Sequence, residues 1–395
     1  MAVDLYDPDT YAGAPPHEVF AELRRTQPVY FQEMASEPGY WAVLKHADVV
    51  HVAREPQLFS ASEGGVMLEN LGPAALDMMR NMLLAMDPPR HVEYRRPIAP
   101  RFKARVIARM EEQIRAICRE IMTEAADKQN VEFVHDVTSS LPSRVIGQLM
   151  GLPADDLPFI HRLAEMNTSG QDADYAADVA PGAIDMAMYA IQFAAVRRQE
   201  PPREDLTTLL LETEFSGNYM TDLDFGAFFV QLVTAGNDTT KTMLSSGLRA
   251  LLDHPEQLAA LRADPALVPG AIEEILRYEN PLHYFRRTAT AHTELRGIEI
   301  APGDKVVMIY TSANRDEDVF DDPQQFDIRR SPNPHLSFGI AEHFCLGVHL
   351  ARLEGRVFFE ELLATFPTIE MTGEPVRVRS NLNNGLKALP VKLGR

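Results

Sequence analysis

The sequence predicts a mainly α-helical protein with a small β region near its N-terminus. Segments with helical periodicity fill most of the 395 residues, and prolines and glycines fall at intervals between them. Strand-like segments are few and short. Because no repeat, low-complexity tract or long Gly/Ser linker divides the chain, we expect residues 1–395 to form one continuous domain.

The expected strands are short runs of aromatic and β-branched residues. One covers Tyr40–Val43, and two others cover Ile298–Ile300 and Lys305–Ile309. The Pro302-Gly303 dipeptide between the last two favours a turn, so we expect them to form a hairpin.

Three expected helices carry the residues that matter below. One begins at Asp87, with Pro88 and Pro89 in its first turn. A longer one runs from about Thr221 to Leu252, because acidic residues in the first turn favour a helix N-terminus. A third follows Cys345, where apolar residues recur at steps of three and four: Leu350, Leu353, Val357, Phe358 and Leu362.

Charge and hydropathy exclude several classes of protein. The net charge of −19 opposes binding to nucleic acid or to an anionic membrane. No apolar run resembling a signal peptide or an anchor occurs near the start, and the longest apolar stretch, around residues 225–235, falls short of the roughly 20 needed for a span. Only Cys118 and Cys345 are cysteines, which fits a reducing compartment. We therefore expect a cytoplasmic protein without a membrane anchor.

One segment departs from the acidic average. Residues 90–109 hold a single acid, Glu93, and seven cations, which we call the basic island: Arg90, Arg95, Arg96, Arg101, Lys103, Arg105 and Arg109. A solvated helix face and a docking surface for an acidic partner are both compatible with this pattern.

The segment 338–347, Phe-Gly-Ile-Ala-Glu-His-Phe-Cys-Leu-Gly, places Cys345 just before a helix. Unpaired backbone N–H groups and the positive end of the helix dipole lower the pKa of a thiol there, so a thiolate can bind a metal such as haem iron. Gly339 and Gly347 let a loop lie close to a flat ring. An isolated cysteine is more often an ordinary core residue, but this spacing favours a ligand.

These ten residues resemble the haem-binding loop of the cytochrome P450 family, whose haem iron is held by a cysteine thiolate. The resemblance implies heme b with Cys345 as the iron ligand, and Phe338, Gly339, Gly347 and Ala235 beside the cofactor. Ala341 departs from the pattern, because the family usually has Gly there. The extra methyl group could shift the loop and the redox potential.

Residues 235–240, Ala-Gly-Asn-Asp-Thr-Thr, are poor helix formers inside the long expected helix. A Thr hydroxyl can bond to the carbonyl four residues earlier and open a notch for a small ligand or water. A simple solvated kink is the alternative. By resemblance to the family's acid-alcohol pair, Asp238 would relay protons and Thr239 would steady dioxygen while the O–O bond is broken.

Two further constellations resemble the family. Glu274 and Arg277, three residues apart, match its buried structural Glu-Arg pair. The haem propionates would be bound by four cationic side chains: His91, Arg95, Arg287 and His343. The neighbouring Arg286 could exchange roles with Arg287.

These motifs occur in family order along nearly the whole chain. The resemblance therefore implies the cytochrome P450 fold, and a soluble bacterial, ferredoxin-dependent member of the family. It implies a monooxygenase that uses dioxygen to hydroxylate a small apolar substrate, either terpenoid, steroid-like or fatty. The candidate pocket residues are Val66, Met67, Leu68, Leu232, Val233, Leu282, Phe285 and Leu382.

Electrons must come from elsewhere, because two cysteines cannot hold an iron–sulfur cluster and no flavin module is evident. We expect a separate ferredoxin and ferredoxin reductase, with docking candidates in the basic island: Arg96, Arg101, Lys103 and Arg105. A peroxide-driven peroxygenase, a non-redox isomerase or dehydratase, and a non-catalytic haem sensor remain alternatives.

Overall fold

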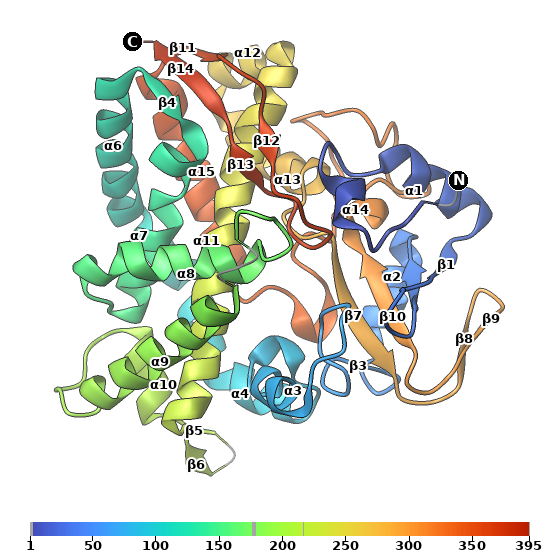
Figure 1. Ribbon diagram of the computed structural model, residues 1–395. Coiled ribbons are helices and arrows are strands. Elements are labelled where there is room, and N and C mark those ends of the chain that lie inside the picture. Colours follow the sequence, from blue (N-terminus) through green and yellow to red (C-terminus); the bar gives the residue numbers. More distant parts are fainter. Residues whose placement is uncertain (1–2, 176–178, 216, 395) are drawn as a thin grey trace.

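The computed structural model describes residues 3–175, 179–215 and 217–394, and it has helices on one side of the molecule and a twisted sheet on the other (Figure 1). Helix α11 (Asp222–Asp253) runs through the helical side. The mainly α architecture with small sheets is therefore confirmed. None of the helices in the described ranges is both long and apolar enough to cross a membrane.

The α-helices vary from single turns to more than thirty residues. Besides α11, they are α1 (His17–Thr26), α2 (His46–Arg54), α3 (Pro73–Arg80), α4 (Arg90–Ile98), α5 (Ala104–Ile107), α6 (Glu111–Lys128), α7 (Ser140–Met150), α8 (Leu157–Thr168), α9 (Val179–Arg197), α10 (Leu206–Glu212), α12 (Pro255–Ala263), α13 (Val268–Tyr278), α14 (Tyr310–Ala313) and α15 (Val348–Thr365).

The largest sheet joins distant parts of the chain in the order β1-β2-β10-β7-β3. Its strands are β1 (Val29–Gln32), β2 (Tyr40–Val43), β3 (Phe59–Ser60), β7 (Tyr284–Ala289) and β10 (Lys305–Ile309). Strand β10 pairs parallel to β2, with Val306 opposite Trp41, and antiparallel to β7. The sheet is thus completed by strands from the second half of the chain.

The smaller sheets tie the C-terminus to the helical side. Strand β14 (Pro390–Gly394) pairs with β11 (Thr368–Met371) and with β4 (Asn130–Glu132). The remaining two-stranded ladders are β5 (Glu214–Phe215) with β6 (Asn218–Tyr219), β8 (Thr293–Leu295) with β9 (Ile298–Ile300), and β12 (Val376–Arg377) with β13 (Leu386–Ala388).

The expected hairpin was wrong, although its strands have the expected bounds. Strand β9 pairs with β8 through the turn at Arg296 and Gly297, not with β10. Both turn residues have positive φ, 51° and 81°, as a tight two-residue hairpin requires. Gly303 donates its N–H to the Ala289 carbonyl, so the Pro302-Gly303 turn leads β10 back alongside β7.

The helix starts follow capping chemistry. Thr221 caps α11, and the capping box with Asp224 satisfies two free N–H groups, which confirms this start. The start expected at Asp87 was three residues early, because α4 begins at Arg90. The Asp87 carboxylate instead accepts a hydrogen bond from the Ala61 N–H at 2.8 Å.

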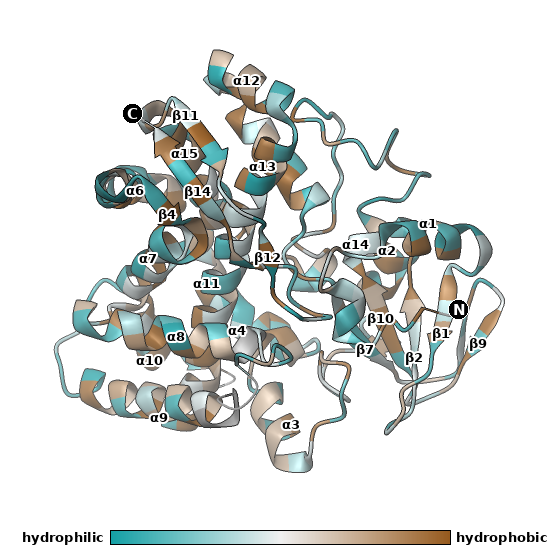
Figure 2. Ribbon diagram, turned by 45° about the horizontal axis from the view of Figure 1, so that its top comes forward, coloured by the Kyte–Doolittle hydropathy of each residue, from teal (hydrophilic) through white to brown (hydrophobic). Residues whose placement is uncertain are grey.

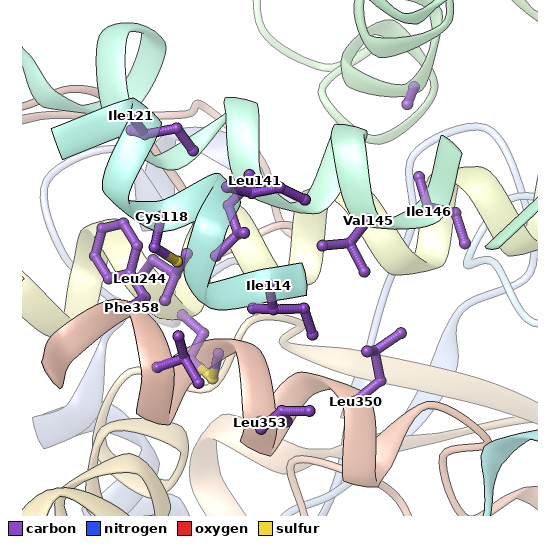
Figure 3. Packing of buried hydrophobic residues seen from close by; sticks show 14 of the residues in the cluster. Ile114, Cys118, Ile121, Leu141, Val145, Ile146, Leu244, Leu350, Leu353 and Phe358 are labelled. Carbon is purple, nitrogen blue, oxygen red and sulfur yellow. The ribbon is translucent and has the colours of Figure 1, made fainter. Parts of the chain in front are cut away.

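The main core lies where α6, α7, α11 and α15 meet (Figure 3). Ile114 and Cys118 of α6 pack with Leu141 of α7, Leu244 of α11 and Phe358 of α15, and all five are buried. Helices at the edge of this core, such as α13, carry hydrophobic and hydrophilic residues on different sides (Figure 2). The core holds α11 and α15 together, and these two helices carry the candidate site.

Candidate active site

The loop before α15 is held by backbone hydrogen bonds. The Cys345 N–H donates to the Phe338 carbonyl at 2.8 Å, and the Phe344 N–H donates to the Ala341 carbonyl at 3.1 Å. Gly339 has a φ of 66°, a conformation that favours glycine. Cys345 keeps some accessible surface, and its thiol lies before the first turn of α15, as the sequence predicts.

The pKa of the Cys345 thiol is raised, whereas the sequence led us to expect a lowered pKa. Burial raises its pKa, while the Gly347 N–H and the cations Arg95 and Arg352 act in the opposite direction without overcoming it. The helix terminus alone therefore does not produce a thiolate. A thiol in such a place loses its proton when it ligates a metal ion.

Ala341 adopts a left-handed backbone conformation with a φ of 58°. An L-residue other than glycine pays roughly 1–2 kcal/mol for this region, because Cβ approaches the carbonyl oxygen. The departure from the usual Gly therefore lies at a position where the backbone itself favours Gly.

Replacing Ala341 with Gly is expected to raise the free energy of unfolding by about 0.5–1 kcal/mol, after the larger chain entropy of Gly is subtracted. Urea denaturation of the two proteins measures the difference. The matched control is Ala351→Gly within α15, which should lower it by about 1 kcal/mol. Equal destabilisation by both changes would contradict the strain at Ala341.

Two histidines and two arginines meet beside the cysteine loop. The imidazole rings of His91 on α4 and His343 lie 4.5 Å apart, and Arg95 donates to the Phe344 carbonyl at 2.5 Å. Within the described residues, both nitrogens of the buried His91 ring and Nε2 of His343 have no hydrogen-bond partner. Arg287 of β7 is buried and close enough to affect both rings.

The charges of Arg95 and Arg287 and the unpaired histidine nitrogens favour a negative partner in this cluster. Burial, Arg287 and the other cations lower the pKa of His343 to about 2, and burial with Arg95 lowers that of His91 to about 4. Unpaired buried polar atoms and like charges cost free energy unless an anion compensates them. The cluster therefore fits a group that carries carboxylates, as haem does.

Arg286 and Arg287 are consecutive residues of β7, so their side chains point to opposite faces of the strand. This tells the two arginines apart. Arg286 points to the loop of residues 67–70, where it donates to carbonyls and to Asn70 Oδ1 at 3.0 Å. Arg287 lies on the opposite face of the strand, with the two histidines. The structure thus keeps Arg287 in the cluster beside the cysteine loop.

The Thr239 side chain makes the backbone contact that the sequence predicts, although α11 stays a continuous α-helix from Asp222 to Asp253. The Thr239 hydroxyl donates to the Ala235 carbonyl at 2.6 Å, the bond to the carbonyl four residues earlier. Ala235 and Thr239 retain accessible surface, whereas Asp238 is 2% exposed. Burial raises the pKa of Asp238 to about 6, although the nearby Lys241 opposes this.

Two residues next to Asp238, Lys241 and Glu165, were not predicted from the sequence. Lys241 Nζ lies 3.0 Å from Asp238 Oδ1 and 2.6 Å from Oε1 of Glu165 on α8, and all three side chains are buried. A Lys three residues after an Asp on one helix face could have indicated the first contact. Glu165 is 76 residues away from Lys241, so no local pattern could have found it.

The Glu274–Arg277 pair forms inside the protein. The two Arg277 nitrogens Nε and Nη2 donate to the carboxylate of Glu274 at 2.8 Å each, and both side chains are 0% exposed. The pair lies at the end of α13 and also contacts residues 314–333. It touches the loop that leads to Cys345 and not the thiol itself.

The pocket candidates divide into two groups. Val66, Leu68 and Val233 are almost fully buried in apolar clusters, so core packing already accounts for them. The others keep accessible surface: Met67, Leu232, Leu282, Phe285 and Leu382. Candidates that are far apart in the sequence come from segments that contact each other. The backbone N–H of Arg286, next to Phe285, donates to the Val66 carbonyl, and Leu282 forms a β-bridge with Asn383, next to Leu382.

Comparisons with known proteins agree with this geometry. The sequence profile described as Cytochrome P450 matches residues 166–393. The steroid C26-monooxygenase of Mycolicibacterium smegmatis is 36% identical over 94% of this chain and 89% of its own length. The methyl-branched lipid omega-hydroxylase of Mycobacterium tuberculosis is 37% identical, covering 98% and 91%.

A solved structure is similar throughout. Mycobacterium marinum cytochrome P450 CYP268A2 in complex with pseudoionone superposes with a TM-score of 0.92 at 37% identity, covering 100% of this chain and 99% of that one. The fold agrees with the sequence-based expectation. This chain therefore belongs to the cytochrome P450 family, as a monooxygenase whose cofactor is thiolate-ligated haem.

Proposed function

We propose that this monooxygenase hydroxylates a small apolar molecule with dioxygen, holds heme b through Cys345, and receives electrons from a separate ferredoxin. The observation that carries the proposal is the cluster of His91, Arg95, Arg287 and His343 beside the cysteine loop, in which three histidine nitrogens lack partners within the described residues. A flat cofactor that carries two carboxylates would satisfy that cluster.

Each side of the cofactor would meet different residues. His91, Arg95, Arg287 and His343 would bind the propionates. Phe338, Gly339 and Gly347 would lie on the same side of the cofactor as Cys345. Gly347 is close to the sulfur, since a Cβ added there would lie 4.0 Å from Cys345 Sγ. Ala235, small and accessible, would lie on the α11 side.

When bound, haem supplies the redox chemistry that consumes dioxygen, electrons and protons and oxidises the substrate. The chain supplies protons and excludes stray water. Asp238, with its pKa raised to about 6, holds a proton at a carboxyl oxygen and gives it up near neutral pH. Thr239 donates its hydroxyl to the Ala235 carbonyl, which fixes the position of its oxygen on α11.

The relatives support an apolar substrate. Their names refer to steroids and to methyl-branched lipids, and the similar structure holds pseudoionone. The accessible candidates that remain in this chain are all apolar: Met67, Leu232, Leu282, Phe285 and Leu382. A terpenoid, steroid-like or fatty substrate therefore fits best.

We also propose that residues 1–395 act as one catalytic unit. Strands from both halves of the chain share the large sheet, and C-terminal β14 pairs with β4. The two cysteines, Cys118 and Cys345, cannot hold an iron–sulfur cluster, which supports a ferredoxin as the source of electrons.

The test begins with dithionite reduction and carbon monoxide, because a thiolate ligand moves the Soret band far to the red of histidine-ligated haem. Pseudoionone, testosterone and hexadecenoic acid then serve as probes for a spin-state shift and for product formation with a ferredoxin, its reductase and NADPH. Conversion of a probe supports the proposal. Conversion with peroxide alone, or tight binding without any product, would contradict it.

The basic island is the proposed ferredoxin surface, since Arg96, Arg101, Lys103 and Arg105 are all exposed. The double variant Arg101→Ala/Lys103→Ala is expected to raise the KM for ferredoxin about fivefold with kcat unchanged, from roughly 0.5 kcal/mol for each exposed contact. Steady-state ferredoxin titration at low salt measures it. Arg25→Ala, an exposed arginine on α1, is the control and should leave KM unchanged.

A further inference from the structure

Segments from three distant parts of the chain meet at the loop between β12 and β13. This loop, residues 378–385, is called the C-terminal loop below. The turns that follow α8, residues 169–175, contact it, and so does the N-terminal segment around Tyr6 and Asp9. These contacts were not predicted from the sequence, and the proposed function makes no use of them.

Asp172 is the centre of this junction. Its side chain is 4% exposed, and Oδ2 accepts a hydrogen bond from the backbone N–H of Arg379 at 3.0 Å. Lys387 Nζ, from β13, lies 3.1 Å from both carboxylate oxygens. Asp174 donates its own backbone N–H to Oδ1 at 3.1 Å. One carboxylate therefore joins the turns after α8 to both ends of the C-terminal loop.

The neighbouring residue, Gln171, binds the same loop nearer its middle. The side-chain oxygen of Gln171 accepts the Asn381 N–H at 2.9 Å, and its backbone carbonyl accepts from Arg379 Nη1 at 2.9 Å. Asn381 Nδ2 in turn donates to the Tyr6 carbonyl at 2.6 Å. Backbone N–H groups of the loop are thus bound on this side as well as its side chains, so its path is fixed.

The other side of the C-terminal loop carries Leu382. The His283 N–H donates to the Leu382 carbonyl at 2.8 Å, and Leu282 forms a β-bridge with Asn383. Of residues 380–386, all of which the structure describes, Leu382 is the only one that is not buried. Its side chain is therefore the apolar group that this part of the chain can offer to a ligand, next to the segment that carries Leu282.

Resting on the proposed function, we propose that Asp172 is a positioning residue for substrate binding. It holds the C-terminal loop in one conformation, and the loop holds Leu382 beside the segment of Leu282. Asp172 contacts the loop, so its effect on the substrate passes through Leu382.

The charges at the junction support this role. Burial opposes the negative charge of Asp172, but the N–H groups of Arg379 and Asp174 and the ammonium group of Lys387 outweigh it and lower the pKa of Asp172. Burial also opposes charge on Lys387, while Asp174 and Asp172 raise its pKa overall. Both partners are therefore charged near neutral pH, and hydrogen bonds between charged groups are stronger than neutral ones.

Asp172→Asn in the haem-loaded enzyme is the first test, because it removes the charge and keeps the shape of the side chain. If the loop then adopts its binding conformation about a tenth of the time, the Kd of an apolar ligand rises about tenfold. A spin-state titration measures it, with whichever of the three probes named above the wild type binds. KM should rise by the same factor while kcat stays within about twofold, because saturating substrate restores the loop.

Asp174→Asn is the matched control, since this carboxylate contacts the same Lys387 nitrogen at 2.6 Å. The Asp174 side chain is 68% exposed, and within the described residues it accepts no N–H group of the C-terminal loop. The change should leave Kd and KM within about twofold of the wild type. An equal loss in Asp174→Asn and Asp172→Asn would overturn the proposal.

Lys387→Met tests the same ion pair from its more exposed side, and it carries the test if Asp172→Asn does not fold. It should raise the Kd by about fivefold, because the N–H groups bound to Asp172 remain in place. A Kd that stays at the wild-type value in Lys387→Met would contradict the proposed role of the pair.

A double-variant cycle shows whether Asp172 acts through Leu382. Leu382→Ala removes the apolar contact and should raise the Kd by itself. In that background, Asp172→Asn should raise the Kd further by about twofold at most, because the loop no longer carries the side chain that it positions. The same rise in both backgrounds would show that Asp172 acts on the fold as a whole, and the proposal would be wrong.

Hydrogen exchange provides a readout that is independent of turnover. In Asp172→Asn, the backbone N–H groups of residues 378–385 should exchange about tenfold faster than in the wild type at the same haem content. Asp174→Asn should leave their exchange unchanged. Unchanged exchange in Asp172→Asn would refute its hold on the loop. Faster exchange with an unchanged Kd would refute the link between the loop and substrate binding.

Failure of the proposed function has a different signature. A wild type without the red-shifted carbon monoxide band would refute the haem-thiolate site itself. The exchange rates of residues 378–385 do not depend on that band, so the two failures are distinguishable.

Discussion

Cys345→Ala is expected to abolish the red-shifted carbon monoxide band and all oxygen-driven product formation. No other thiol can take its place, because Cys118 is buried among α6, α7 and α15 in the main core. Loss of the thiolate also removes the electron donation that favours O–O cleavage. Reduced carbon monoxide difference spectra and product analysis at matched haem content measure both effects.

The matched control is Cys118→Ala, which removes the other thiol. Burial raises the pKa of Cys118 to about 12, so this thiol stays protonated and behaves as a small apolar side chain. The variant should keep the red-shifted band and the wild-type rate for each haem. A band that persists in Cys345→Ala, or one that disappears in Cys118→Ala, would refute the proposed ligand.

Much of this site could be predicted because its motifs are local. The cysteine loop spans ten consecutive residues, and the Thr239 hydroxyl bonds to a carbonyl only four residues away. The sequence also showed that Ala341 replaces the Gly usual in the family. It did not show the left-handed φ of 58°, because the type of a residue does not determine its backbone angles.

The contacts that sequence reasoning could not supply all cross large separations. The roles of Arg286 and Arg287 depend on which face of β7 meets the loop at residues 67–70, and that is set by pairing with β10 and β3. Glu165 reaches Lys241 only because α8 packs across α11. Tertiary packing decides such contacts, and no periodicity along the chain records it.

The missed hairpin has a different cause. The sequence offered two turns, and Pro302-Gly303 matched the stronger pattern. Arg296-Gly297 forms the hairpin instead, because β10 buries all five of its residues between β2 and β7. Burial in the sheet outweighed the local turn preference.

The buried Glu274–Arg277 pair should contribute strongly to the free energy of unfolding. Glu274→Gln is expected to lower the free energy of unfolding by about 3–5 kcal/mol, because it leaves the fully buried guanidinium of Arg277 without its counter-charge. Urea denaturation at matched haem content measures the change. The neighbouring Glu273→Gln is the control, since Glu273 is partly exposed and pairs with Arg352, and about 1 kcal/mol is expected there.

Removing both charges should not restore stability, which separates this pair from a simple ion pair. Arg277 also donates to the carbonyls of Asn314, Pro323 and Gln325, and Glu274 also accepts from the Asp327 N–H. The double variant Glu274→Gln/Arg277→Met loses the three bonds that Arg277 donates and leaves buried carbonyls unpaired, although the introduced amide oxygen can still accept from the Asp327 N–H. It should therefore remain within about 1 kcal/mol of Glu274→Gln. Recovery to the wild-type value would show that charge alone, and not the anchoring of residues 314–327, is what the pair contributes.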